Sequence, residues 1–128
     1  MSRPLFNCLI RTHHITSRKK VQRVRRAASQ FDVDWVLIRY GGSPGIMFGE
    51  AHDATALTEW VAAVKALRYK DFRCVIRPQP APPTARGPPL LATGFSETEA
   101  VADFAKQMEL RGLEDWWKRG MGYSTDGG

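Results

Sequence analysis

The chain has 128 residues, of which 43% are hydrophobic and 25% charged, and its formal net charge is +6. These values describe one globular domain with a single hydrophobic core. No apolar run approaches the roughly 20 residues of a membrane-spanning helix, and the N-terminus lacks a signal-peptide core, so we expect neither a membrane-spanning nor a secreted protein. The positive charge favours an anionic partner.

The chain begins with a predicted strand and a predicted basic helix. Residues 4–11 form a short apolar run, which is typical of a mostly buried strand. The helix that follows extends to about Gln30. Its apolar face recurs at positions i, i+3, i+7 and i+10, occupied by Val21, Val24, Ala28 and Phe31.

The N-terminus of this helix carries basic residues, although acidic residues are favoured at that end of a helix. Either Thr16 or Ser17 is a suitable N-cap, which places Arg18, Lys19 and Lys20 in the first turn. That end of a helix already carries about half a positive charge, so cations there are unfavourable. A bound phosphate would relieve the conflict, because free N–H groups and basic side chains would point at it.

Charge is polarised along the sequence. Eight of the nineteen Lys and Arg residues lie within the first 26 positions, where there is no acid. On a helical wheel, Lys19, Arg23 and Arg26 lie opposite the apolar face. The alternative is that this ridge is simply a solvated basic face.

Two strands, a helix and another strand follow. Residues 33–40 form the second strand, the glycine-rich stretch 41–45 a turn, and residues 46–48 a short, fully apolar third strand. Asp53 is a suitable N-cap for a second amphipathic helix. The fourth strand, 72–77, alternates, with Phe72, Cys74 and Ile76 facing inward and Arg73, Val75 and Arg77 on the other face.

The order βαββαβ predicts an α+β fold, the ferredoxin-like sandwich over residues 4–77. In that arrangement a four-stranded antiparallel sheet carries both helices on one face, with the first and third strands central. Cys8 and Cys74 would then lie on neighbouring strands, and we expect both to be reduced thiols of an intracellular protein.

The rest of the single domain is predicted to be an extension. Residues 78–92 hold six of the eight prolines and predict an extended strap across the domain, and residues 122–128 a frayed tail. Between them, 93–121 predict two helices, the first opened by a capping box of Ser96 and Glu99 and ended at Gly112. Further along, Trp116 and Trp117 anchor the last helix or form a binding patch.

The sequence carries no motif that indicates catalysis, a metal or a cofactor. Adjacent histidines such as His13 and His14 point in different directions, and no Cys or carboxylate stands at zinc-ligand spacing. Neither cysteine has an evident base, and both a phosphate-binding glycine loop and a G-x-S-x-G elbow are missing. We therefore expect a protein that is not an enzyme.

Several segments in order resemble a known family. They are HHITSRKK, the strand region SPGIMFGE, the helix ending ALRYKDF, and FSETEAVADFAKQMELRGLEDWWKRGM. Together they resemble the C-terminal domain of pre-mRNA-processing splicing factor three, which is also found after RWD domains in eukaryotic proteins. The resemblance implies a ferredoxin-like core with a helical extension that binds RNA at a single-stranded 3′ end next to a duplex.

These observations predict a non-catalytic RNA-binding module in the nucleus or alternatively the cytoplasm, and the resemblance implies a splicing-related role. The resemblance carries over to the basic segment, and charge placement adds the ridge and the fourth strand. The predicted RNA-binding residues are His14, Arg18, Lys19, Lys20, Arg23, Arg26, Arg73 and Arg77. The alternative is a protein-interaction adaptor that docks partners through the Pro-rich arm or through Trp116 and Trp117.

Overall fold

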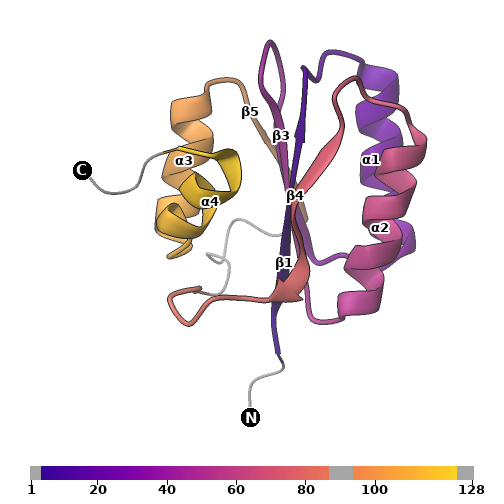
Figure 1. Ribbon diagram of the computed structural model, residues 1–128. Coiled ribbons are helices and arrows are strands. Elements are labelled where there is room, and N and C mark those ends of the chain that lie inside the picture. The colour runs from indigo at the N-terminus through magenta and orange to yellow at the C-terminus, as the bar shows by residue number, and fades with distance from the viewer. Residues whose placement is uncertain (1–3, 87–93, 124–128) are drawn as a thin grey trace.

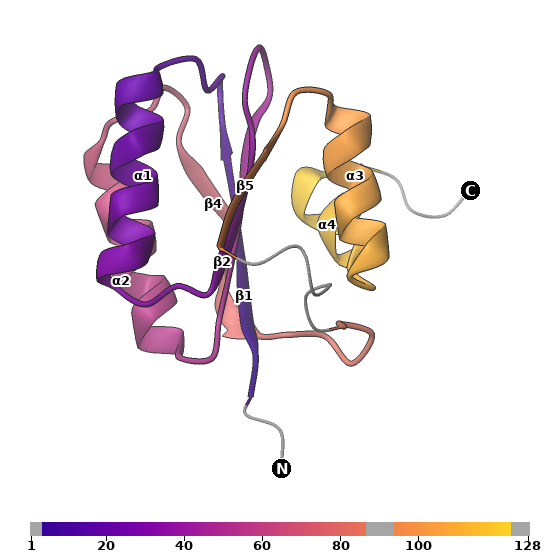
Figure 2. The same cartoon turned by 180° about the vertical axis from the view of Figure 1, so that it is seen from behind.

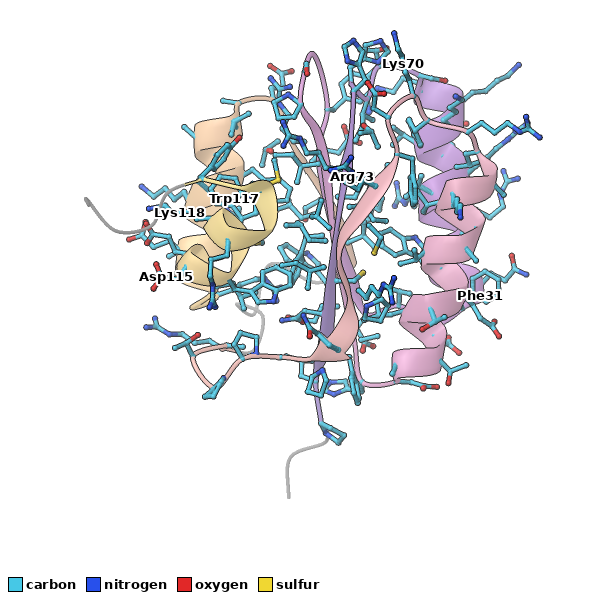
Figure 3. All side chains as sticks on the ribbon, viewed as in Figure 1. Phe31, Lys70, Arg73, Asp115, Trp117 and Lys118 are labelled. Carbon is cyan, nitrogen blue, oxygen red and sulfur yellow. The ribbon has the colours of Figure 1, made fainter. Side chains whose placement is uncertain are left out.

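The computed structural model describes residues 4–86 and 94–123. It has three layers, a five-stranded mixed sheet between two pairs of helices (Figure 1). Helices α1 (Arg18–Gln30) and α2 (Ala54–Ala66) cover one face, and α3 (Val101–Leu110) and α4 (Glu114–Met121) cover the other (Figure 2). Side chains fill the space on both sides of the sheet (Figure 3). Among the described helices, none is both long and apolar enough to cross a membrane.

The sheet order is β4-β1-β3-β2-β5. Strand β3 (Gly45–Ala51) pairs antiparallel with β1 (Phe6–Thr12) and with β2 (Trp35–Arg39), and β1 also pairs antiparallel with β4 (Arg73–Pro80). The prediction that β1 and β3 lie inside the sheet is confirmed.

A fifth strand was not predicted. Strand β5 (Gly94–Thr98) pairs parallel with β2, so the sheet is mixed and not a four-stranded antiparallel one. The predicted capping box is wrong for the same reason, because Ser96 lies inside β5. Helix α3 begins after Ala100, which makes no side-chain cap hydrogen bond. The predicted end of this helix before Gly112, which has a positive φ of 70°, is confirmed.

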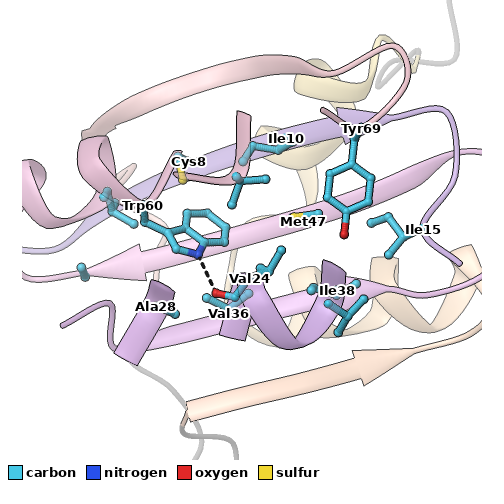
Figure 4. Close-up of a cluster of buried hydrophobic side chains, with 14 of the residues drawn as sticks. Cys8, Ile10, Ile15, Val24, Ala28, Val36, Ile38, Met47, Trp60 and Tyr69 are labelled. Carbon is cyan, nitrogen blue, oxygen red and sulfur yellow. Dashed lines mark hydrogen bonds between the residues drawn. The ribbon is translucent and has the colours of Figure 1, made fainter. Parts of the chain in front are cut away.

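The first helical layer packs as the periodicity predicts. Val21, Val24 and Ala28 of α1 are buried with Leu57, Trp60 and Val64 of α2, against the side chains that β1, β2 and β3 direct to this face (Figure 4). The indole Nε1 of Trp60 donates to the carbonyl of Val24 at 3.2 Å, which joins the two helices. Ser17 and Asp53 cap them, as predicted.

Strand β4 departs from the predicted alternation. Cys74 pairs with Ile10, but Ile76 pairs with Leu9, so two β4 residues advance for one β1 residue. Such a bulge changes which face the following side chains point to. Phe72 and Cys74 therefore pack on the first layer, whereas Ile76 packs with Val75 on the second. Cys8 and Cys74 do lie on neighbouring strands, as predicted, and both are free thiols.

The second helical layer is aromatic and also contains a buried ion pair. Phe48, Phe104, Trp116 and Trp117 are at most 7% exposed. Trp116 and Trp117 therefore pack α4 on the sheet, and the expectation that they offer a docking surface to a partner is wrong. At the end of α3, Arg111 Nη1 donates to Glu50 Oε1 at 2.6 Å, and both side chains are buried.

The Pro-rich region begins as part of the sheet. Residues 78–80 continue β4, which corrects the predicted strap boundary, and the chain then turns beneath the second layer. There the Arg86 N–H donates to the Arg111 carbonyl at 2.8 Å. The rest of the predicted strap, from residue 87 to 92, lies outside the described residues, as do positions 124–128 of the predicted tail.

Candidate functional site

One end of the sheet brings together basic residues from segments that are far apart in the sequence. Arg11 at the end of β1 pairs with Arg73 at the start of β4, and the His13 N–H donates to the Lys70 carbonyl at 2.8 Å. Helix α1 starts at the same end, where an isolated bridge joins Ile15 to Gly41. We call this region the basic end (Figure 3, around Lys70). Its basic residues are Arg11, His13, His14, Arg18, Lys19, Lys20, Arg39, Arg68, Lys70 and Arg73.

Acidic residues are fewer there. In the described part of the chain, the carboxylates at or near the basic end include those of Asp71, Glu97 and Glu99, and that of Asp103 in the first turn of α3. Asp71 lies 3.7 Å from His13 Nδ1, and Glu97 pairs with Arg18. The basic end therefore keeps a positive excess, which attracts anions.

The N-terminus of α1 is built as the sequence predicts. The Ser17 hydroxyl accepts a hydrogen bond from the Lys20 N–H at 3.2 Å, and the first turn has no acid. One of the four N–H groups that a helix start leaves without an intrahelical partner is thereby satisfied. The exposed Lys19 side chain lies beside them. This combination is suited to an anion.

Arg18 has a partner that its sequence neighbours do not reveal. Its Nη1 donates to both carboxylate oxygens of Glu97, at 2.7 and 2.9 Å, and its guanidinium lies 3.8 Å from the centroid of the Tyr40 ring. The hydrogen bond to Glu97 raises the pKa of Arg18 further. Because β5 supplies Glu97, much of the Arg18 charge is already matched within the protein.

Lys20 extends across to the end of α2. Its Nζ lies 3.5 Å from the Arg68 carbonyl and 5.0 Å from the centroid of the Tyr69 ring. Burial raises the pKa of Tyr69 to about 12, so this ring stays neutral. Next to it, the rings of His13 and His14 lie 4.9 Å apart, and both side chains are exposed.

Five of the eight predicted site residues meet at the basic end: His14, Arg18, Lys19, Lys20 and Arg73. The other three do not, since Arg23 and Arg26 follow the exposed face of α1 away from this end. Arg77 lies further along β4, in a groove against α2. The predicted cluster is therefore divided between an end of the sheet and two flanking surfaces.

Sequence reasoning missed five members of this cluster: Arg11, His13, Arg39, Arg68 and Lys70. Arg39 donates to the carbonyls of Gly42, Pro44 and Glu99, so it holds the turn at the basic end in place. The sequence feature that could have indicated them is their position, because these residues lie where strands or helices begin or end. Only the strand order shows that those points meet.

A groove opens at the basic end between β1, β4 and the C-terminus of α4. Its volume is about 520 Å³, and Arg11, His13 and Arg73 are among its lining residues. A second groove of about 570 Å³ lies between α2 and β4. Within residues 4–86 and 94–123, no three His, Cys, Asp or Glu side chains are grouped as a metal site would require.

Comparison of the chain with protein-family models and with curated proteins finds no match.

Proposed function

We propose that this chain is a non-catalytic RNA-binding domain whose basic end contacts phosphates. One observation supports the proposal above the others: basic side chains from β1, the N-terminus of α1, the end of β2 and the start of β4 gather at one end of the sheet, with fewer carboxylates among them. Clustered Lys and Arg residues on one face are the usual electrostatic footprint of a nucleic-acid-binding protein.

The exposed members of this cluster differ in the contacts they offer. Lys19 and Lys70 are exposed at the rim and suited to phosphate contacts, which are sequence-independent. The exposed His14 ring offers a surface on which an unstacked base can pack. Arg18 is suited to a positioning role, because Glu97 and Tyr40 fix its guanidinium.

The resemblance extends the proposal. We propose that β1 to β4 with α1 and α2 are a ferredoxin-like core, to which β5, α3 and α4 add a second layer. The ligand is then an RNA with a single-stranded 3′ end next to a duplex. The domain would then be part of a ribonucleoprotein of the nucleus.

The proposal is tested by removing two exposed cations of the basic end. The variant Lys19→Ala/Lys70→Ala should bind short RNAs more weakly than the native chain, with a log–log salt slope lower by about 1.4, or roughly 0.7 per lost single-strand phosphate contact. Fluorescence anisotropy at two salt concentrations, on RNAs with and without a 3′ overhang, measures both quantities. The matched control is Lys106→Ala/Arg119→Ala, which removes two exposed cations from the second layer and should leave the slope unchanged.

Failure to bind RNA in this titration would favour the adaptor function. If the native protein binds none of these RNAs below about 100 μM at low salt, its affinity is weaker than ordinary non-specific binding, and RNA binding is wrong. The groove between α2 and β4 then becomes the better candidate, because it combines apolar side chains with cations. Its lining includes Val61, Phe72 and Pro78, with Lys65 and Arg77 at the same surface, which suits an acidic peptide that carries an apolar side chain.

A further inference from the structure

The groove between β1, β4 and the C-terminus of α4 has the character of an anion site. Its volume is about 520 Å³. The polar and charged side chains that line it come from the ends of three strands and the loops beside them: Arg11, Thr12, His13, Ser43, Asp71 and Arg73. Phe72, Val75 and Met121 contribute apolar surface.

Two arginines line this groove side by side. Arg11 and Arg73 are directly paired in the antiparallel register of β1 and β4, and both are exposed. Like charges at such positions oppose the pairing of the strands. Within the described residues, no carboxylate pairs with either guanidinium, and the nearby Asp71 lies against His13 at 3.7 Å. An anion between the two arginines would remove this repulsion.

The wall of the groove holds Arg11 in place. A Cβ at Gly120 would lie 2.6 Å from Ile76 Cδ1 and 2.8 Å from Leu9 Cδ2, so the absence of a side chain lets α4 approach the sheet closely. The Met121 carbonyl, at the negative end of α4, thereby accepts a hydrogen bond from Arg11 Nη1 at 3.3 Å. This bond uses one of the five N–H donors of Arg11 and leaves the others for a ligand.

We propose that this groove binds the terminal phosphate of a nucleic-acid strand, an assignment that rests on the proposed RNA-binding function. A terminal phosphate carries a charge of about −1.5 to −2 near neutral pH and three strong acceptor oxygens, whereas an internal phosphodiester carries one charge. The higher charge matches two neighbouring guanidiniums. The strand attached to that phosphate would then cross the basic end, because His13 lines the groove and His14 leads to the N-terminus of α1.

The test compares RNAs of one sequence that carry a 5′-phosphate, a 3′-phosphate or hydroxyls at both ends, as unlabelled competitors in an anisotropy assay. At least one phosphorylated RNA should bind about tenfold more tightly than the hydroxyl form, the gain expected from charge-assisted hydrogen bonds. The two phosphorylated arms show which end is bound. Arg73→Gln should abolish this preference, whereas the control Arg77→Gln, on the same strand but outside this groove, should retain it.

The possible failures can be told apart. Equal binding of all three RNAs by the native protein overturns the terminal-phosphate site and leaves RNA binding standing. Persistence of the preference in both Arg73→Gln and Arg11→Gln overturns the assignment to this groove. Absence of binding by every RNA overturns the proposed function, and the phosphate site with it.

Discussion

The two helical layers are attached to the same sheet by different kinds of interaction. Beneath α1 and α2 the buried side chains are almost entirely apolar, and one side-chain hydrogen bond, from Trp60 to the Val24 carbonyl, joins the helices. Beneath α3 and α4, the aromatic cluster surrounds the ion pair of Glu50 and Arg111. Apolar contacts therefore hold the first layer on the sheet, whereas the second layer also depends on one buried charged contact.

The polar contacts of the second layer converge on one point. The guanidinium of Arg111 lies 3.4 Å from the centroid of the Trp35 ring, and the Asn7 amide, oriented as a donor, lies 3.1 Å from Glu50 Oε2. Burial raises the pKa of Glu50 and lowers that of Arg111, while the bond between them opposes both changes. A buried charge is costly without its partner, so we infer that this pair fixes the position at which α3 ends on the sheet.

The largest effect is expected from breaking that pair. Arg111→Ala leaves the Glu50 carboxylate buried without its ion-pair partner and should lower the free energy of unfolding by about 3–5 kcal/mol. Urea unfolding followed by circular dichroism measures this change. A loss below about 1 kcal/mol would show that the second layer does not depend on the pair.

A double variant separates the cost of breaking the pair from the value of having it. Glu50→Gln/Arg111→Met removes both charges and should recover much of the lost stability, because an ion pair and an apolar replacement are often similar in energy.

Trp60→Phe is the comparison in the first layer. It removes the bond to Val24 and part of a fully buried ring, and should cost about 1–3 kcal/mol, the hydrogen bond plus the small cavity.

An intermediate effect is expected where α4 contacts the sheet. Gly120→Ala places a methyl group against Leu9 and Ile76 and should destabilise the protein by about 1–3 kcal/mol, the usual cost of overpacking. Denaturant unfolding is again the measurement. Gly42→Ala is the matched control, because nothing lies within 4 Å of the added Cβ, and it should be nearly neutral. Equal effects of the two substitutions would contradict the close approach of α4.

The smallest effect is expected at the cap of the first layer. Ser17→Ala removes the acceptor for the Lys20 N–H and should cost about 1 kcal/mol, as loss of an N-cap usually does. Ser29→Ala, an exposed position in the same helix, provides the comparison and should leave stability unchanged. If both substitutions behave alike, Ser17 does not act as the cap.

The first layer could be predicted from the sequence because its signals are local. Helical periodicity placed α1 and α2, apolar runs placed β1 to β3, and alternation placed β4. Strand β5 could not be predicted in this way, since it is short and its partner β2 is distant in the chain. The spacing of Ser96 and Glu99 also imitates a helix start. Likewise, no local pattern relates Glu50 to Arg111.

The candidate site was predictable in its α1 part and not in the remainder. Arg18, Lys19 and Lys20 form a run in the sequence, which marks them as a cluster. Arg11 and Arg73 are single cations in separate strands, and only the pairing of β1 with β4 places them opposite each other. The match of Arg18 with Glu97 depends in turn on the unpredicted strand β5.

The parallel pairing of β5 with β2 also sets an order of folding. Trp35 pairs with Gly94, so about sixty residues separate the partners, whereas β1 to β4 all lie before this strand. Contacts across such a separation form late, because loop-closure entropy must be overcome first. During synthesis the second face, with Leu9 and Phe48, therefore stays uncovered until residues 94–121 emerge, and a nascent chain at that stage is prone to aggregate or to need a chaperone.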